Sequence, residues 1–556
     1  MRGPLIAIIA LSLVYWGVAA LSPVAIGQWQ DDGIYVCTAK ALAEGRGYRH
    51  IQIPGEPWQT KYPILYPALL AAAWLFHPQF PQNAALLLAP GAVAAAVFVV
   101  MSSLYLRRVF GESWITAGIL GGLAALSPAV VSIVRFTMSE TVYAALAVSA
   151  LYCLDARTQR PTAGVRGGWT ALSAALAALA MLTRSIGITL AAAAITALLL
   201  RRRWRDAIIA AAVIAALLTP WQLWKRSADA ANGPLQTTAL LAPDLVYGLW
   251  TPQNAEQVVR AVVQNTVRVA MTLGMYQLAL PLEWFVGAVM KPGPVSGLAH
   301  GICYFLLLLL VLGYGVSVWR GWTALHLAAL LYAGLVLVWP FDPYRFVVPW
   351  TPFVIYFVFA GVRATHDGLA RLARLTPPSL SRDVVCGALG LAALTCFAID
   401  DIRMLRSTRK EYYARDLGPI DLTEFDATAA WVREHALEHE VCASAYSAWL
   451  YLATGRQSYY FWPVSDPYDV FYGPDRKLSQ FFAIPSPREY DRLTSQLGGS
   501  LEKMFREARI TYYVEHAAAN PATIVMMKTR DGQSWLRPAF TTPGKQATVF
   551  TLVSRP

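Results

Sequence analysis

The chain has 556 residues, of which 56% are hydrophobic and only 14% are charged, whereas charged residues make up about a quarter of an ordinary soluble domain. This composition excludes a purely soluble protein. A net charge of +12 would indicate nucleic-acid binding in a soluble protein, but in a membrane protein lysines and arginines first set the orientation, so we expect no nucleic-acid partner. The six cysteines lack a paired spacing such as CxxC, so neither a zinc site nor a disulfide framework is indicated.

Eleven apolar segments, short or tilted ones included, are candidates to cross a bilayer, which needs about 20 apolar residues. They lie near 4–26, 84–106, 114–134, 138–156, 168–184, 186–200, 206–224, 301–318, 323–339, 346–362 and 384–400. The first is too long for the apolar part of a signal peptide, and we interpret it as a retained helix. The sequence therefore predicts a polytopic α-helical membrane protein with about eleven transmembrane helices.

Positive charges test this count, because the loops on the cytoplasmic side of a membrane protein are rich in lysine and arginine. With a cytoplasmic N-terminus, the expected inner loops hold clusters such as Arg107-Arg108 and the run RRRWR at 201–205. The short outer loops hold only Arg135, Arg184 and Arg345. One long helix over 168–200 would place RRRWR outside, so the charges favour two short spans hinged at 183–185.

Three larger regions fall on the outer side. The first, 27–83, contains the short apolar stretch ILYPALLAAAWLF, which we expect to lie along the membrane interface. The second, 225–300, contains a lid-like amphipathic helix with Gln253, Glu256 and Arg260 on its polar side. The chain is thus predicted to divide into a transmembrane domain, 1–403, and a C-terminal extracytoplasmic α/β domain, 404–556, with strands at EVCASA, ITYYVEH and ATVFTLV.

Two adjacent carboxylates, Asp31 and Asp32, follow the first predicted helix and precede a helical stretch. An aspartate at a helix N-terminus caps free amides and suits the helix dipole, which accounts for one of the two. A carboxylate that is partly desolvated at a membrane boundary has a raised pKa, which suits a general base. From these residues alone, capping and catalysis stay equally open.

Other chemically capable residues stand at the same predicted face of the membrane. Lys61 and Tyr62 lie among prolines in TKYPILYP, where lysine is either a lipid contact or a phosphate clamp. Glu140 follows Arg135 in RFTMSETVY, which favours a local ion pair or a cap from Ser139. Arg345 opens a helix, where a cation opposes the dipole unless an anion such as Asp342 compensates.

These residues, with Arg184, combine carboxylates that accept protons with cations that neutralise an anionic leaving group, as group transfer from a phosphate-linked donor requires. A transporter or flippase of a lipid-linked or glycan substrate is the alternative, but it favours ionisable groups within the spans and internal repeats. Neither is evident. A noncatalytic membrane scaffold, with the outer charges as lipid anchors, is the third possibility.

The order of these motifs resembles the GT-C glycosyltransferases, in particular the branch of protein O-mannosyltransferases, lipid A aminoarabinose transferases and Rgt-type transferases. The resemblance covers the whole chain in order and rests on DDGIYVCTAKALAEGRGY, KYPILYP, RFTMSE, TRSIG, PYRFVVPWTPF and the C-terminal domain. It implies an inverting, mannosyltransferase-like enzyme of the cell envelope. Such an enzyme moves a hexose or pentose from a polyprenyl-phosphate donor to a glycan, lipid or protein acceptor, in the inner (plasma) membrane.

By position, the resemblance implies that Asp31 is the base, that Asp32 is its acidic neighbour, and that Glu140 holds the acceptor or orients the site. Lys61 and Arg345 would bind the donor phosphate, together with Arg184. The family often has Glu where Asp32 stands, and it has a tyrosine before the short apolar run and Pro where this chain has Phe346. Tyr344 or Tyr62 could therefore supply the phenol. We expect neither a metal nor another cofactor.

Overall fold

The computed structural model describes the chain in fourteen segments, which leave out parts of the second outer region and of the C-terminal domain. These segments are residues 2–21, 26–27, 31–158, 166–232, 255–277, 296–339, 343–372, 388–399, 401–402, 412–414, 418–420, 422–460, 502–516 and 535–553. Two residues from the sequence analysis, Gln253 and Asp342, lie outside the described residues.

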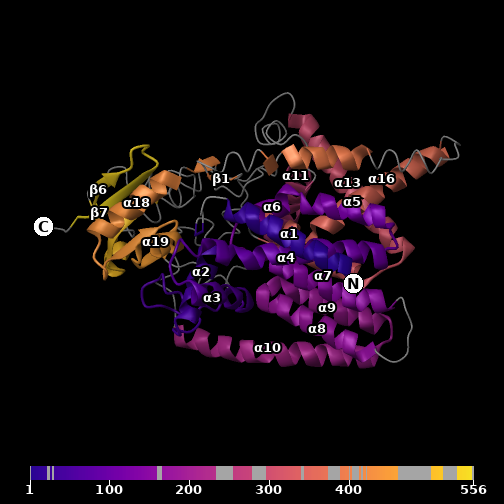
Figure 1. The fold of residues 1–556 in the computed structure, drawn as a ribbon, viewed down its shortest axis with the longest axis horizontal. Coiled ribbons are helices and arrows are strands. Elements are labelled where there is room, and N and C mark those ends of the chain that lie inside the picture. The colour runs from indigo at the N-terminus through magenta and orange to yellow at the C-terminus, as the bar shows by residue number, and fades with distance from the viewer. Residues whose placement is uncertain are drawn as a thin grey trace.

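Helices dominate the N-terminal three quarters of the chain (Figure 1). The α-helices of this part are α1 (Arg2–Ala20), α2 (Asp31–Ala43), α3 (Leu65–Phe76), α4 (Ala84–Arg108), α5 (Trp114–Ala125), α6 (Pro128–Val134), α7 (Glu140–Thr158), α8 (Arg166–Thr183), α9 (Ile188–Leu200), α10 (Trp204–Asn232), α11 (Ala255–Thr272), α13 (Ser296–Arg320), α14 (Ala324–Leu337), α15 (Tyr344–Val347) and α16 (Thr351–Leu372). Shorter helical turns are η1 (Ser185–Gly187), η4 (Leu273–Gln277) and η5 (Val348–Trp350), and a further apolar helix spans Ala388–Ile399.

Each predicted span coincides with a helix, which confirms a multi-pass membrane protein. Among the described residues, five helices are long and apolar enough to cross a membrane, or six if the pair α5 and α6, bent by 52°, forms one span. Four other predicted spans correspond to shorter apolar helices, and α7, which has 19 residues, is not among the five. The count of eleven therefore stays a prediction. Some boundaries differ: α1 ends at Ala20, and α10 continues to Asn232.

The predicted hinge between two short spans is confirmed. Helix α8 ends at Thr183, Arg184 is extended, and α9 begins at Ile188 after one 3-10 turn. Contacts at the two ends show that the chain reverses there. Arg184 reaches the start of α7, whereas Arg201, just after α9, pairs with Asp155 near the end of α7.

The helix pair α13 and α16 shows why this bundle can pack so closely. A Cβ atom on Gly313 would lie 1.7 Å from the carbonyl oxygen of Phe357, and one on Gly361 would lie 2.1 Å from that of Leu309. Only glycine fits at either position, so the two backbones touch directly, as small residues permit between membrane helices.

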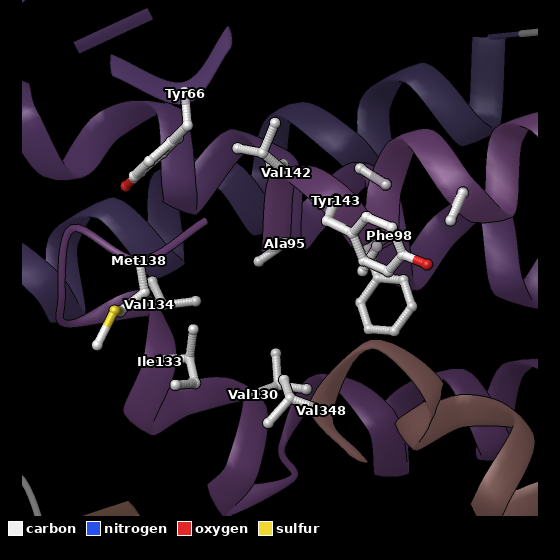
Figure 2. Close-up of a cluster of buried hydrophobic side chains, with 14 of the residues drawn as sticks. Tyr66, Ala95, Phe98, Val130, Ile133, Val134, Met138, Val142, Tyr143 and Val348 are labelled. Carbon is white, nitrogen blue, oxygen red and sulfur yellow. The ribbon is translucent and has the colours of Figure 1, made fainter. Parts of the chain in front are cut away.

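The apolar core of the bundle joins segments that are far apart in sequence. Figure 2 shows Tyr66 of α3, Ala95 and Phe98 of α4, Val130 of α6, and Tyr143 of α7 among buried side chains of one cluster. This packing fixes α3, α6 and α7 relative to one another. These helices adjoin the segments that carry the candidate site residues.

The C-terminal domain contains a five-stranded mixed sheet, which confirms the predicted α/β character. Its strands are β3 (Val441–Ser444), β4 (Ser458–Tyr460), β5 (Ile510–His516), β6 (Leu536–Thr541) and β7 (Ala547–Leu552), in the order β4-β3-β5-β7-β6. Strands β4, β3 and β5 are parallel, and β7 and β6 add to them antiparallel. Helices α18 (Leu422–His435) and α19 (Ser447–Thr454) pack with the sheet, and the short strands β1 (Tyr412–Ala414) and β2 (Gly418–Ile420) pair separately. The sheet lies at one end of the molecule, near α2 and α3 (Figure 1).

Candidate active site

The two adjacent aspartates at the start of α2 have different surroundings. Both carboxylate oxygens of Asp32 accept hydrogen bonds from backbone amides: Oδ2 from Gly27 N at 2.7 Å and Oδ1 from Gly33 N at 2.8 Å. The Asp32 side chain is completely buried. Its carboxylate therefore satisfies one amide of the first turn of α2 and ties the loop at Gly27 to it, which favours the capping interpretation for Asp32.

Asp31 instead faces charged and phenolic side chains. Its Oδ1 accepts a hydrogen bond from the Tyr62 hydroxyl at 2.5 Å, and its Oδ2 lies 2.9 Å from Nη2 of Arg345. The Asp31 and Arg345 side chains are 22% and 20% exposed. This ion pair joins residues 314 positions apart, and it retains access for a further molecule.

Glu140, the first residue of α7, supplies a second carboxylate. Its Oε1 lies 2.7 Å from Nη1 of Arg184 and 3.9 Å from Nη1 of Arg345. Arg184 also donates to the Ser139 hydroxyl at 3.1 Å, and that hydroxyl lies 3.1 Å from the hydroxyl of Tyr35 on α2. Glu140 thus forms ion pairs with two arginines that are distant in the sequence, Arg184 and Arg345.

The loop that carries Lys61 and Tyr62 is held from two sides. Asn232, at the end of α10, accepts a hydrogen bond from Trp58 N at 2.8 Å and donates to Trp58 O at 3.0 Å. The Tyr48 hydroxyl donates to Tyr62 O at 3.1 Å. Lys61 Nζ lies 4.6 Å from the centre of the Tyr62 ring, so its charge stands next to the phenol that bonds Asp31.

The pKa of Asp31 corrects one expectation. Burial alone raises the pKa of this carboxyl, as the sequence predicted, but Arg345, Lys61 and the Tyr62 hydrogen bond together outweigh burial. The net pKa of Asp31 is therefore below its ordinary value. In the absence of substrate, Asp31 is a carboxylate held by cations.

The remaining predicted residues fall around this network with less defined roles. Tyr344 is half-buried beside Arg345 at the start of α15. The Phe346 ring stacks under the guanidinium of Arg184, 5.2 Å from its centre. Arg135 is buried at the end of α6. Asp342, the anion expected to compensate Arg345, lies outside the described residues. Asp31 and Glu140 form ion pairs with Arg345 and so compensate its charge.

Sequence reasoning did not single out Tyr35 or Arg268, and it considered Ser139 only as a cap. Ser139 and Tyr35 link α7 to α2 through their hydroxyls, and helical spacing from Asp31 could have indicated Tyr35. Arg268 on α11 is a fully buried arginine whose Nη1 lies 3.3 Å from Oδ1 of Asn265. Asn265 in turn donates to three carbonyls at the end of α14. The sequence analysis considered the polar residues on the exposed side of α11 and not those on its buried side.

Comparison with known proteins shows which solved structures have a similar fold. No family model matches the sequence, and a search of curated proteins found no match. Among solved structures, ArnT from Cupriavidus metallidurans bound to undecaprenyl phosphate is 13% identical with a TM-score of 0.53, over 100% of this chain and 99% of its own. The archaeal oligosaccharyltransferase AglB from Archaeoglobus fulgidus, in complex with an inhibitory peptide and a dolichol-phosphate, is 13% identical with a TM-score of 0.55. That match covers 99% of this chain and 74% of AglB.

These likenesses extend over the transmembrane bundle and the C-terminal domain together. The chain has the fold of the GT-C membrane glycosyltransferases, which confirms the resemblance at the level of fold. At such low identity a shared fold does not imply a shared reaction, because the reaction depends on the residues of the site.

Proposed function

We propose that this protein is an inverting glycosyltransferase that moves one sugar, a hexose or a pentose, from a polyprenyl-phosphate donor to an acceptor hydroxyl. The observation that carries the proposal is the accessible Asp31–Arg345 ion pair at 2.9 Å, beside Tyr62 and Lys61. A carboxylate that accepts a proton and cations that accept an anion stand side by side, as such a transfer requires.

In the proposed step, Asp31 takes the proton of the acceptor hydroxyl as its oxygen attacks the anomeric carbon of the sugar. A new carbon–oxygen bond forms while the bond from that carbon to the phosphate oxygen breaks. The electron pair leaves with the lipid phosphate, and one displacement inverts the configuration. The general base contributes about 10²–10⁴-fold to such a reaction.

The cations would stabilise the departing phosphate. Arg345 presents a planar guanidinium with donors suited to two phosphate oxygens, Lys61 supplies a compact charge, and Arg184 lies within the same network. Tyr62 and Tyr344 add phenolic donors. When the donor phosphate engages Arg345 and Lys61, these cations stabilise the Asp31 carboxylate less, so the pKa of Asp31 rises and its basicity increases.

The other two acidic residues, Glu140 and Asp32, would hold parts of the site in position. Glu140 orients Arg184 and Arg345 through its ion pairs, and it is the residue we assign to acceptor orientation. Asp32 fixes the loop before α2 through two amides. This assignment divides the acidic pair into one base and one cap.

The class of donor is supported by the similar folds, since ArnT was captured with undecaprenyl phosphate and AglB with dolichol-phosphate. We assign the acceptor to a glycan, lipid or protein on the outer face of the plasma membrane. The N-terminus would then be cytoplasmic and the C-terminal domain, 404–556, extracytoplasmic, as the charge pattern predicts.

The test is transfer by the purified protein in proteoliposomes, with polyprenyl-phosphate sugars as donors and released polyprenyl phosphate as the readout. Asp31→Asn is expected to remain folded and to lose about 10³-fold in kcat. Glu44→Gln, which changes an exposed carboxylate just past the end of α2, is the matched control and should retain full activity. Normal transfer by folded Asp31→Asn would refute the proposal.

Two further measurements separate this enzyme from a flippase and from a metal-dependent transferase. In cells lacking the protein, the lipid-linked sugar should accumulate in the outer leaflet with its acceptor unmodified, whereas loss of a flippase would leave it in the inner leaflet. Transfer should continue in excess EDTA, because lysine and arginine neutralise the leaving phosphate. Complete loss of transfer in EDTA that added metal restores would contradict that expectation.

A further inference from the structure

Helix α19 of the C-terminal domain packs directly on the loop that begins α2. A Cβ atom on Gly33 would lie 2.5 Å from the Cβ of Ala448 and 2.7 Å from the Cα of Gly27. Gly27 has a positive φ of 93°, and a Cβ there would lie 2.6 Å from the Cα of Trp449. We call this contact of Gly27 and Gly33 with Ala448 and Trp449 the seam. No side chain larger than hydrogen fits at either glycine, so glycine at both positions allows the two domains to touch.

The two glycines are also the residues that Asp32 joins. Its carboxylate accepts the amides of Gly27 and Gly33, so the seam and the cap fix the same backbone. Asp31 lies between those glycines and belongs to the first turn of α2. A displacement of α19 would therefore reach Asp31 through one residue of backbone.

Further contacts extend the seam beyond the start of α2. The Cys37 thiol, one and a half turns along α2, faces Ala448 O with the sulfur 3.9 Å away. In the loop that follows, Gln52 O accepts a hydrogen bond from Ser458 N at 2.8 Å, and Ile51 O accepts one from Gln457 at 3.2 Å. The C-terminal domain thus contacts both α2 and the loop after it.

Helix α19 is itself rigidly supported. The Trp449 ring lies 4.8 Å from the Phe425 ring of α18 in an edge-to-face arrangement and 5.6 Å from the His516 ring of β5. All three side chains are buried. The sheet and α18 therefore fix the position of α19, and through α19 the position of the loop before α2.

We propose that the C-terminal domain completes the active site: Ala448 and Trp449 of α19 are positioning residues that hold Asp31 at its distance from Arg345. This inference rests on the proposed function for its catalytic consequence. It gives the C-terminal domain a direct part in the chemistry, separate from any recognition of the acceptor. A misplacement of about 1 Å at a reacting group can reduce a rate about 10²-fold.

The test replaces Ala448 by side chains of graded size. Ala448→Leu should separate α19 from Gly33 and lower kcat about 10²-fold, with the KM for the donor changed less than about threefold, because Lys61 and Arg345 come from other elements. Ala448→Val, a smaller enlargement, should lower kcat less than Ala448→Leu does. Ala430→Leu, the same change at an exposed position of α18, is the matched control.

A pH profile distinguishes positioning from simple loss of folded protein. Arg345 and Lys61 lower the pKa of Asp31, so moving Asp31 away from them raises it. The acid limb of kcat/KM should therefore shift to higher pH in Ala448→Leu. A smaller folded fraction would lower the whole profile without moving the limb, and that result would overturn the inference.

Labelling of Cys37 reports on the seam without any catalysis. In a variant that keeps Cys37 as the single cysteine, a maleimide should label this buried thiol slowly, and Ala448→Leu should accelerate labelling at least tenfold. Gly33→Ala, which makes the clash from the α2 side, should do the same. Faster labelling with unchanged kcat would overturn the inference while leaving the proposed function intact. Absence of transfer with every donor, with the labelling as expected, would instead refute the proposed function and with it the catalytic role of the seam.

Discussion

The two ends of the helix bundle each hold a buried carboxylate beside an arginine, and they differ in how far those groups are satisfied. At the end that the charge pattern predicts to be inner, Asp155 is 1% exposed and accepts four hydrogen bonds, from Arg201, Tyr105 and the amides of Ala324 and Leu325 at the start of α14. At the end predicted to be outer, Asp31 and Arg345 are about one-fifth exposed.

We expect this difference between a charge that only stabilises the fold and one that binds substrate. Asp155 satisfies the first amides of α14 and an arginine at once, so its bonding capacity is used within the protein. In the outer network two carboxylates, Asp31 and Glu140, share Arg345, and an incoming phosphate can replace either of them. Charged residues of the same types thus hold helices together at one end and, in the function we propose, bind substrate at the other.

Removal of the inner carboxylate is expected to have the largest effect on stability. Asp155→Ala leaves Arg201, the Tyr105 hydroxyl and two helix amides without their acceptor, which should cost about 3–5 kcal/mol of unfolding free energy. Denaturant titration of the protein in detergent measures this cost, and transfer per folded molecule should stay within about threefold. Unchanged stability would show that Asp155 does not stabilise the fold.

The outer arginine should affect catalysis more than stability. Arg345→Gln removes the cation that we assign to the leaving phosphate, and kcat should fall about 10²–10³-fold. Steady-state kinetics in proteoliposomes measure the loss. Arg320→Gln, at the exposed end of α13, is a matched control with full activity expected. Normal transfer by Arg345→Gln would contradict the assignment of Arg345 to catalysis.

The pH dependence sharpens the assignment of Asp31 as base. Asp31 must be ionised to accept a proton, and its pKa is below the ordinary value, so kcat/KM of the unmodified protein should decline only below the ordinary pKa of an aspartate. Arg345→Gln removes the main cation that lowers this pKa, so the acid limb should shift to higher pH. The same acid limb in both proteins would exclude Asp31 as the group that titrates.

The smallest effect is expected at a second inner ion pair. Arg363 donates to both oxygens of Glu112, at 3.1 and 3.2 Å, and the two side chains are largely but not completely buried. Glu112→Gln retains one acceptor oxygen, so the unfolding free energy should fall by only about 1 kcal/mol. The same titration as for Asp155→Ala measures it. A loss as large as that of Asp155→Ala would mean that the contribution of an ion pair to stability does not depend on its exposure to water.

Much of this organisation was predictable from sequence because lipid imposes simple constraints. Apolar runs predicted where the helices lie, and the arginine clusters predicted the break at Arg184 that the structure contains. The strands ITYYVEH and ATVFTLV correspond to β5 and β7. Local pattern was sufficient wherever a segment's own hydrophobicity decided its structure.

The sequence by itself determined which end of the bundle would gather Asp31, Glu140, Arg184 and Arg345, since span count and charge place loops on one face or the other. Only the tertiary structure decided which partners they take: Arg345 pairs with Asp31 from 314 positions away, and Asp32 turns to the amides of Gly27 and Gly33. It also reversed the expected pKa of Asp31. The physical reason is that an ionisable group responds to charges within a few ångströms in space, and sequence patterns do not measure those distances.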